Sequence, residues 1–227
     1  TEADLLKQGY QLKWQDNFDG AFLNRADWNV ELHEKGWVNS EWQEYVDSDK
    51  NIQVKDGKLL IKPVETVNAD GTRSYTSGRI NTQGKHDFKY GYFECRAKVP
   101  PGKGYLPAFW MMPTDENLYG QWPKCGEIDI MEVMGQETNK AYGTIHYGEP
   151  HDQSQGTCTV DAKNNFADQY HTYACDWEPG KITWYIDGVK FHEESDWFSA
   201  KSGQGEVAYP APFDQPFYMI LNLAAAG

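Results

Sequence analysis

Residues 122–135 read WPKCGEIDIMEVMG, and three carboxylates stand in this otherwise apolar stretch. Glu127 and Asp129 are separated by one residue, whereas Asp129 and Glu132 are separated by two. Side chains alternate between the faces of a strand, so regular pairing would turn Glu132 away from the other two acids. One extra residue near positions 130 and 131, a β-bulge, would return Glu132 to their face. The spacing therefore predicts a bulged strand with three acids on one face.

Three carboxylates in such a row cannot all ionise cheaply, so we expect at least one raised pKa. Hydrolysis of a glycoside with retention needs one ionised and one protonated carboxyl group about 5–5.5 Å apart. A metal site and a solvated acidic strand face are the alternatives. Trp110 and Trp122 flank the acids, and an indole ring offers a flat apolar surface on which a sugar can stack. These two flanking tryptophans favour a saccharide-binding site over a metal site or a solvated acidic strand.

The rest of the chain consists mainly of short alternating segments divided by Gly, Pro, Asn and Asp. Segments 91–99, 181–194 and 217–224 are examples, and Asp187-Gly188 is typical of a tight hairpin turn. We expect helical turns only at 2–8 and 164–169. Many strands at such spacing predict an all-β sandwich or barrel. With no linker or repeat, residues 1–227 are predicted to form a single domain.

The composition of the chain limits the kinds of molecule that it is expected to bind. The net charge of −13 argues against nucleic acid and anionic membranes, and weakly favours an uncharged substrate. No apolar run is long enough for a membrane span, and the first residues do not resemble a signal peptide. Segment 47–58 begins like a calcium loop, but Ile52 and Lys58 occupy positions that need Gly and Glu. We expect a turn leading into a strand there.

The four cysteines do not have the spacing of a zinc site. Free thiols and one disulfide both remain open for Cys95, Cys125, Cys158 and Cys175.

Together, PAFWMMP (107–113), WPKCGEIDIMEVMG and GTIHYG (143–148) resemble glycoside hydrolase family 16, in its laminarinase branch (endo-β-1,3-glucanase). The resemblance extends from WQDNFDG (14–20) through SGRINT (77–82) to the end of the chain. It implies a β-jelly-roll sandwich of two antiparallel sheets with a concave substrate cleft. Two residues between Asp and the second Glu match the bulged form of the family motif.

Carried onto this sequence, the resemblance implies Glu127 as nucleophile, Glu132 as general acid/base and Asp129 as the assisting carboxylate between them. The implied substrate-binding residues are Trp122, at the start of the same segment, and one residue from each of four other segments: Trp110, His146, Arg79 and Asn39. A structural salt bridge is the alternative for Arg79, and a buried core position is the alternative for His146.

Two departures from the family pattern concern the C-terminal end, LNLAAAG (221–227). The final family strand is missing here, and AAAG replaces a more glycine-rich loop. That strand supplies part of a structural calcium site, so we do not expect an intact calcium site, and we expect no cofactor for catalysis. A sheet edge left open could pair with another chain, although we expect a monomer.

The resemblance implies retaining endo-hydrolysis of β-1,3-glucan, with mixed β-1,3/1,4-glucan as a further substrate, by a secreted bacterial protein. Agarase-like or carrageenase-like hydrolysis is an alternative within the fold, but Lys124 is the one cationic residue close to the motif. A non-catalytic glucan-binding jelly roll usually lacks one or both Glu residues, which are present here. Transglycosylation would use the same intermediate.

Overall fold

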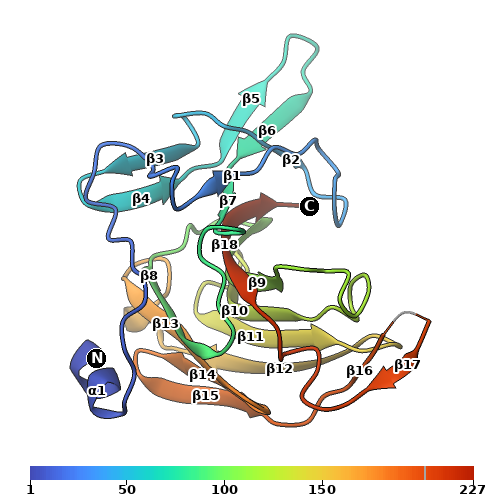
Figure 1. Cartoon of the computed structure of the whole chain (residues 1–227). Coiled ribbons are helices and arrows are strands. Elements are labelled where there is room, and N and C mark those ends of the chain that lie inside the picture. The colour runs from blue at the N-terminus through green and yellow to red at the C-terminus, as the bar shows by residue number, and fades with distance from the viewer. Residues whose placement is uncertain (202) are drawn as a thin grey trace.

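A computed structural model describes residues 1–201 and 203–227. Two antiparallel sheets packed face to face make the body of the molecule (Figure 1). The larger sheet has seven strands in the order β1 (Asn29–Val30), β7 (Arg79–Asn81), β18 (Phe217–Ala225), β9 (Tyr105–Pro113), β10 (Glu127–Val133), β11 (Lys140–Tyr147) and β12 (Asp152–Thr159). The smaller has four, in the order β15 (Val189–Glu194), β14 (Lys181–Ile186), β13 (His171–Glu178) and β8 (Gly91–Ala97).

In the part of the chain that the structure describes, three small sheets and two short helices surround this body. The first small sheet contains β2 (Gln43–Tyr45), β6 (Arg73–Ser77) and β5 (Val64–Val67); the others pair β3 (Ile52–Lys55) with β4 (Lys58–Ile61) and β16 (Ser199–Lys201) with β17 (Gly205–Val207). Strands β2 and β6 run parallel, so the predicted pair of antiparallel sheets describes the sandwich but not these additions. The helices are α1 (Glu2–Lys7) and a 3₁₀ turn, η1 (Ala162–Asn164).

The hydrophobic core lies between the two large sheets. Strand β10 sends Ile128, Ile130 and Met131 into it, and the smaller sheet contributes Trp177 and Trp184. All five side chains are almost completely removed from solvent. The other face of the seven-stranded sheet is therefore free to carry polar groups, and it is the face on which the acids lie.

Several local predictions are confirmed. Asp187 and Gly188 both have positive φ at the turn between β14 and β15, as a tight hairpin requires. Strand β18 pairs on both sides, as expected of the apolar segment 217–224. Segment 47–58 forms a turn followed by β3. The helical turn expected at 164–169 was wrong in position, because η1 ends at Asn164 after Asp161 caps its backbone N–H groups.

All four cysteines are free thiols, so the alternative of one disulfide is not realised. Burial raises the pKa of Cys125 to about 12, and it also raises the pKa of Cys175. Among the described residues, no helix has the length and apolar character needed to cross a bilayer.

Candidate active site

Strand β10 carries a β-bulge at the predicted place. Its pairing with β11 joins Asp129 to Thr144 and Glu132 to Tyr142. Ile130 and Met131 together therefore oppose the single residue Gly143, and the register with β9 also shifts between Asp129 and Met131. Glu132 thus returns to the face of Glu127 and Asp129, and the sequence prediction is confirmed. We call this face of the seven-stranded sheet the carboxylate face.

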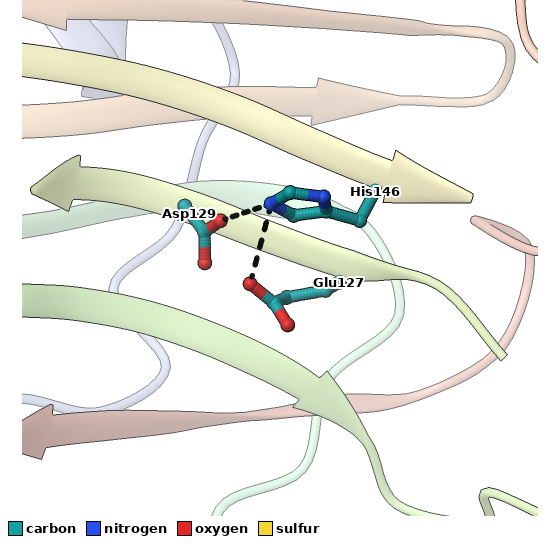
Figure 2. A group of neighbouring side chains, drawn as sticks. All are labelled: Glu127, Asp129 and His146. Atoms are coloured by element: carbon teal, nitrogen blue, oxygen red, sulfur yellow. Dashed lines mark ion pairs between the residues drawn. The ribbon is translucent and has the colours of Figure 1, made fainter. Parts of the chain in front are cut away.

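His146 of β11 lies directly opposite Glu127 in the ladder. Its imidazole points toward the two acids of β10, as Figure 2 shows, with Nε2 3.2 Å from Asp129 Oδ2 and 3.8 Å from Glu127 Oε2. The first of these contacts is close but not aligned as a hydrogen bond. Asp129 Oδ2 consequently has no hydrogen-bond partner among the described residues, although it is fully buried.

Trp122, in the loop before β10, holds the first acid from the other side. Its indole Nε1–H donates to Glu127 Oε1 at 3.1 Å, while its ring stays half-exposed. The ring also lies near His146 and His151, with centroid distances of 5.7 and 4.9 Å. Trp122 can therefore orient Glu127 and still offer an open indole surface to a ligand.

His151 is a site residue that the sequence prediction missed. Its Nε2 lies 3.0 Å from Nδ1 of His146, so the two imidazoles share a hydrogen bond. The direction of this bond depends on the protonation of His146: a neutral ring with Nε2–H toward the carboxylates accepts at Nδ1, whereas a protonated ring donates from Nδ1 to His151. The available signal was the pair of histidines on either side of the Gly148–Pro150 turn, which brings two strand ends together.

The three carboxyl groups all have raised pKa values. Burial is the largest cause in each, followed by the charge of a neighbouring acid: Asp129 acts on Glu127, Glu132 on Asp129, and Glu127 on Glu132. The pKa of Glu132 rises to about 7, and no neighbour opposes this shift. His146 and the Trp122 N–H favour the ionised form of Glu127. These two partners oppose the rise in the pKa of Glu127 without cancelling it, whereas nothing opposes the rise at Glu132. This difference between the two glutamates is in the direction that a nucleophile and an acid need.

A metal ion is the alternative use of this cluster. One ligand atom from each of Glu127, Asp129 and His146 lies within 4.8 Å of the other two. Two carboxylates and an imidazole suit a transition metal better than calcium. The Trp122 N–H occupies one oxygen of Glu127, so the set would bind with fewer free donors than the residue types suggest.

Arg79 of β7 lies on the carboxylate face, but its charge is already paired. Its Nε donates to Glu31 Oε2 at 2.9 Å, and its guanidinium lies between the rings of Trp37 and Trp110. Asn81 donates to the same oxygen of Glu31. Of the two interpretations offered by the sequence, the structural salt bridge matches this placement; contact with sugar hydroxyls stays a prediction.

The two remaining predicted substrate contacts differ in where they lie relative to the acids. Trp110 is opposite Asp129 in the ladder, and its Nε1–H donates to Asn222 at 2.7 Å. Asn39 is exposed, has a positive φ, and contacts Glu41 at 3.4 Å. Trp110 is thus part of the carboxylate face, whereas the side chain of Asn39 contacts Glu41 and none of the three acids.

One hollow in the surface is formed by residues other than the acids. It lies between segment 20–25 and strand β3 and includes the Arg25–Asp47 ion pair. In its lining, the hydrogen bond from Arg25 lowers the pKa of Asp47, the opposite of the direction found for the three acids of β10. The chemistry of the residues therefore places the candidate site on the carboxylate face.

Comparison with known proteins matches residues 37–227 to the family model for glycosyl hydrolases family 16. Glucan endo-1,3-beta-glucosidase A1 of Niallia circulans is 40% identical over all of this chain, which spans 35% of that protein. Glucan endo-1,3-beta-glucosidase of Cryptopygus antarcticus is also 40% identical, covering 95% of this chain and 80% of its own length. The laminarinase structure from Rhodothermus marinus is 34% identical with a TM-score of 0.81, and covers 96% of this chain and 86% of that one.

Proposed function

Because the chain belongs to glycosyl hydrolases family 16, we propose that it cleaves internal bonds of β-1,3-glucan with retention of configuration. Mixed β-1,3/1,4-glucan is the proposed further substrate. The observation that carries the proposal is the bulge of β10, which puts Glu132 on the same face as Glu127. The chain spans about a third of the Niallia protein, so the proposal concerns the catalytic unit described here.

In the first step, Glu127 attacks the anomeric carbon while Glu132 gives its proton to the departing glycosidic oxygen. The C–O bond to the leaving sugar breaks as the ester bond to Glu127 forms. The Trp122 N–H keeps one oxygen of Glu127 in place, and the charge of His146 favours the ionised nucleophile. Buried and next to Glu127, Asp129 can hold a proton and donate to it, which limits repulsion within the row.

In the second step, Glu132 is ionised and can accept a proton from water. The water oxygen attacks the anomeric carbon as the ester bond to Glu127 breaks, and the proton taken from that water leaves Glu132 in its acid form for the next cycle. Transfer to a second sugar would follow the same path with a hydroxyl group in place of water. Analysing products at high oligosaccharide concentration separates hydrolysis from transfer.

The primary test follows products from laminarin, lichenan, agarose and carrageenan by size and by anomeric configuration. We expect oligosaccharides with a newly formed β-anomer from laminarin, and smaller amounts from lichenan. Products from a sulfated galactan alone would support the second hydrolase class, and binding without new reducing ends would support a glucan-binding protein. Activity that disappears on chelation and returns with a metal would instead support the metal interpretation of the cluster.

Azide separates the roles of the two glutamates. With a dinitrophenyl β-glycoside, Glu127→Ala should form an α-glycosyl azide, because azide takes the position of the lost nucleophile. Glu132→Ala should form the β-glycosyl azide, because azide attacks the intermediate that Glu127 still makes. The same anomer from both variants would contradict the assignment. Since the substrate is a polymer that cells do not import intact, we further propose that the chain acts outside the cell.

A further inference from the structure

Two glycines face the core directly behind the bulge. Gly143 of β11 and Gly156 of β12 are partners in the ladder, and Gly143 is the residue opposite the bulge. Neither has the positive φ that usually explains a glycine. A Cβ at Gly143 would lie 2.4 Å from Cδ1 of Trp184, and one at Gly156 would lie 2.4 Å from Cγ of His192. Both glycines are therefore needed for space.

The space is filled by two aromatic residues of the opposite sheet. Trp184 of β14 and His192 of β15 are also ladder partners, and their rings stack at a centroid distance of 4.7 Å. The β14–β15 ladder has its own register shift next to Trp184, because Phe191 is an extra residue. His192 Nε2 lies 3.0 Å from the hydroxyl of Ser154 on β12. The two sheets thus each bear a bulge where this aromatic pair enters.

The indole of Trp184 reaches the bulge itself. Its Nε1–H donates to the backbone carbonyl of Asp129 at 2.9 Å, and the ring is fully buried. A bulge disrupts the ladder locally, and a buried carbonyl without a partner is costly. Asp129 is the last residue in register before the bulge, so this bond fixes the point at which the strand departs from regular pairing.

We propose that Trp184 is a positioning residue that holds the β10 bulge and so keeps Glu132 beside Glu127 for the acid step. The inference rests on the proposed function. Glu127 precedes the bulge and has its own supports in Trp122 and the ladder with β11. Glu132 follows the bulge, so a change in the backbone at Asp129 moves it relative to Glu127. Loss of the indole N–H should therefore impair proton donation more than nucleophilic attack.

The test compares two buried tryptophans. Trp184→Phe removes the N–H at the bulge, and replacing Trp184 with benzothienylalanine removes only the N–H while keeping the ring volume. Trp177→Phe is the matched control, because Trp177 is also fully buried and donates to a backbone carbonyl, that of Phe213, at 3.1 Å. Both phenylalanine variants should lose similar thermal stability. The benzothienylalanine variant is the decisive one if Trp184→Phe does not fold.

The activity readout uses laminarin together with phenyl and dinitrophenyl β-laminaribiosides. For both Trp184 variants we expect kcat on laminarin and on the phenyl glycoside to fall about 10- to 100-fold with KM within about twofold of the parent. The dinitrophenyl group leaves without a proton, so kcat/KM for that substrate, which reports formation of the glycosyl-enzyme alone, should fall by less than about threefold. The control should change both aryl glycosides by the same small factor.

Equal losses for the two aryl glycosides in the Trp184 variants, or activity equal to that of the control, would overturn the inference. A parent chain that releases nothing from laminarin or from either glycoside would instead overturn the proposed function. The two failures are therefore distinct.

Discussion

Glu31 and Glu132 lie on the same face of the seven-stranded sheet, yet their carboxyl groups behave in opposite ways. Burial acts to raise the pKa of both. At Glu31 this effect is outweighed by Arg79, Asn81 and His33, and the pKa falls below its usual value. Glu132 has another acid as its charged neighbour and no cation, so its pKa rises to about 7. Partners, more than burial, decide whether a buried acid is structural or reactive.

The largest expected effect is a loss of turnover when either Glu127 or Glu132 is replaced by an uncharged residue. Glu127→Gln and Glu132→Gln should each lower kcat on laminarin by about 10³-fold or more, because the proposed mechanism gives one acid a covalent role and the other a proton-transfer role. Glu116→Gln is the control, since Glu116 is a half-buried loop acid whose pKa is also raised by burial but which lies outside the row of three acids. Reducing-sugar assays at saturating laminarin measure the effect. Turnover at the wild-type rate in either the Glu127 or the Glu132 variant would contradict the contrast between Glu31 and Glu132.

The next largest effect is a loss of stability when the ion pair between Glu31 and Arg79 is broken. Arg79→Met leaves Glu31 buried without its cation, which should lower the free energy of unfolding by about 3–5 kcal/mol at pH 7. Glu31 contributes stability above its unfolded pKa and loses it as the pH falls through its lower folded pKa, so the difference should shrink near pH 3. Urea unfolding at both pH values measures it. Arg25→Met, which breaks an exposed pair with Asp47, should cost about 1 kcal/mol or less. Equal costs for the two arginine variants would contradict the expectation.

Glu132→Gln should also stabilise the fold. The raised pKa means that the folded chain binds a proton at Glu132 more tightly than the unfolded chain does. The contribution of Glu132 to the free energy of unfolding therefore falls as the pH rises from about 4.5 to about 7. An uncharged Gln avoids this loss, and we expect a gain of about 1–3 kcal/mol at pH 8 that disappears at pH 4. Thermal unfolding across that range measures it, with the exposed Glu137→Gln as control. A gain that persists at pH 4 would point to packing instead of charge.

The smallest effect should come from the indole that supports the nucleophile. Trp122→Phe removes the N–H that favours ionised Glu127, so the pKa of Glu127 rises further. The acidic limb of the kcat/KM profile should move to higher pH, and the maximum should fall about fivefold. Trp42→Phe, at an exposed tryptophan without contact to the acids, should leave the limb in place. An unmoved limb in Trp122→Phe would show that the N–H does not tune the nucleophile.

The bulge could be predicted from sequence because it is a local matter of spacing: alternation and three acids within six residues leave few solutions. The fold class followed similarly from repeated short alternating segments. The partners of these residues could not be predicted. The bond from Trp184 to Asp129 joins two sheets, and the pairing of Arg79 with Glu31 depends on which strands become neighbours. Such contacts depend on long-range register, which local patterns do not contain.

Two buried cysteine thiols, Cys125 and Cys175, can report when the structure around them opens. Cys125 belongs to a small apolar cluster beside Trp110, and Cys175 lies in the core between the sheets. With both thiols fully buried and kept protonated, an alkylating reagent can reach them only when the surrounding structure opens. The alkylation rate of Cys125 would thus measure opening near the carboxylate face. The alkylation rate of Cys175 would measure separation of the two sheets.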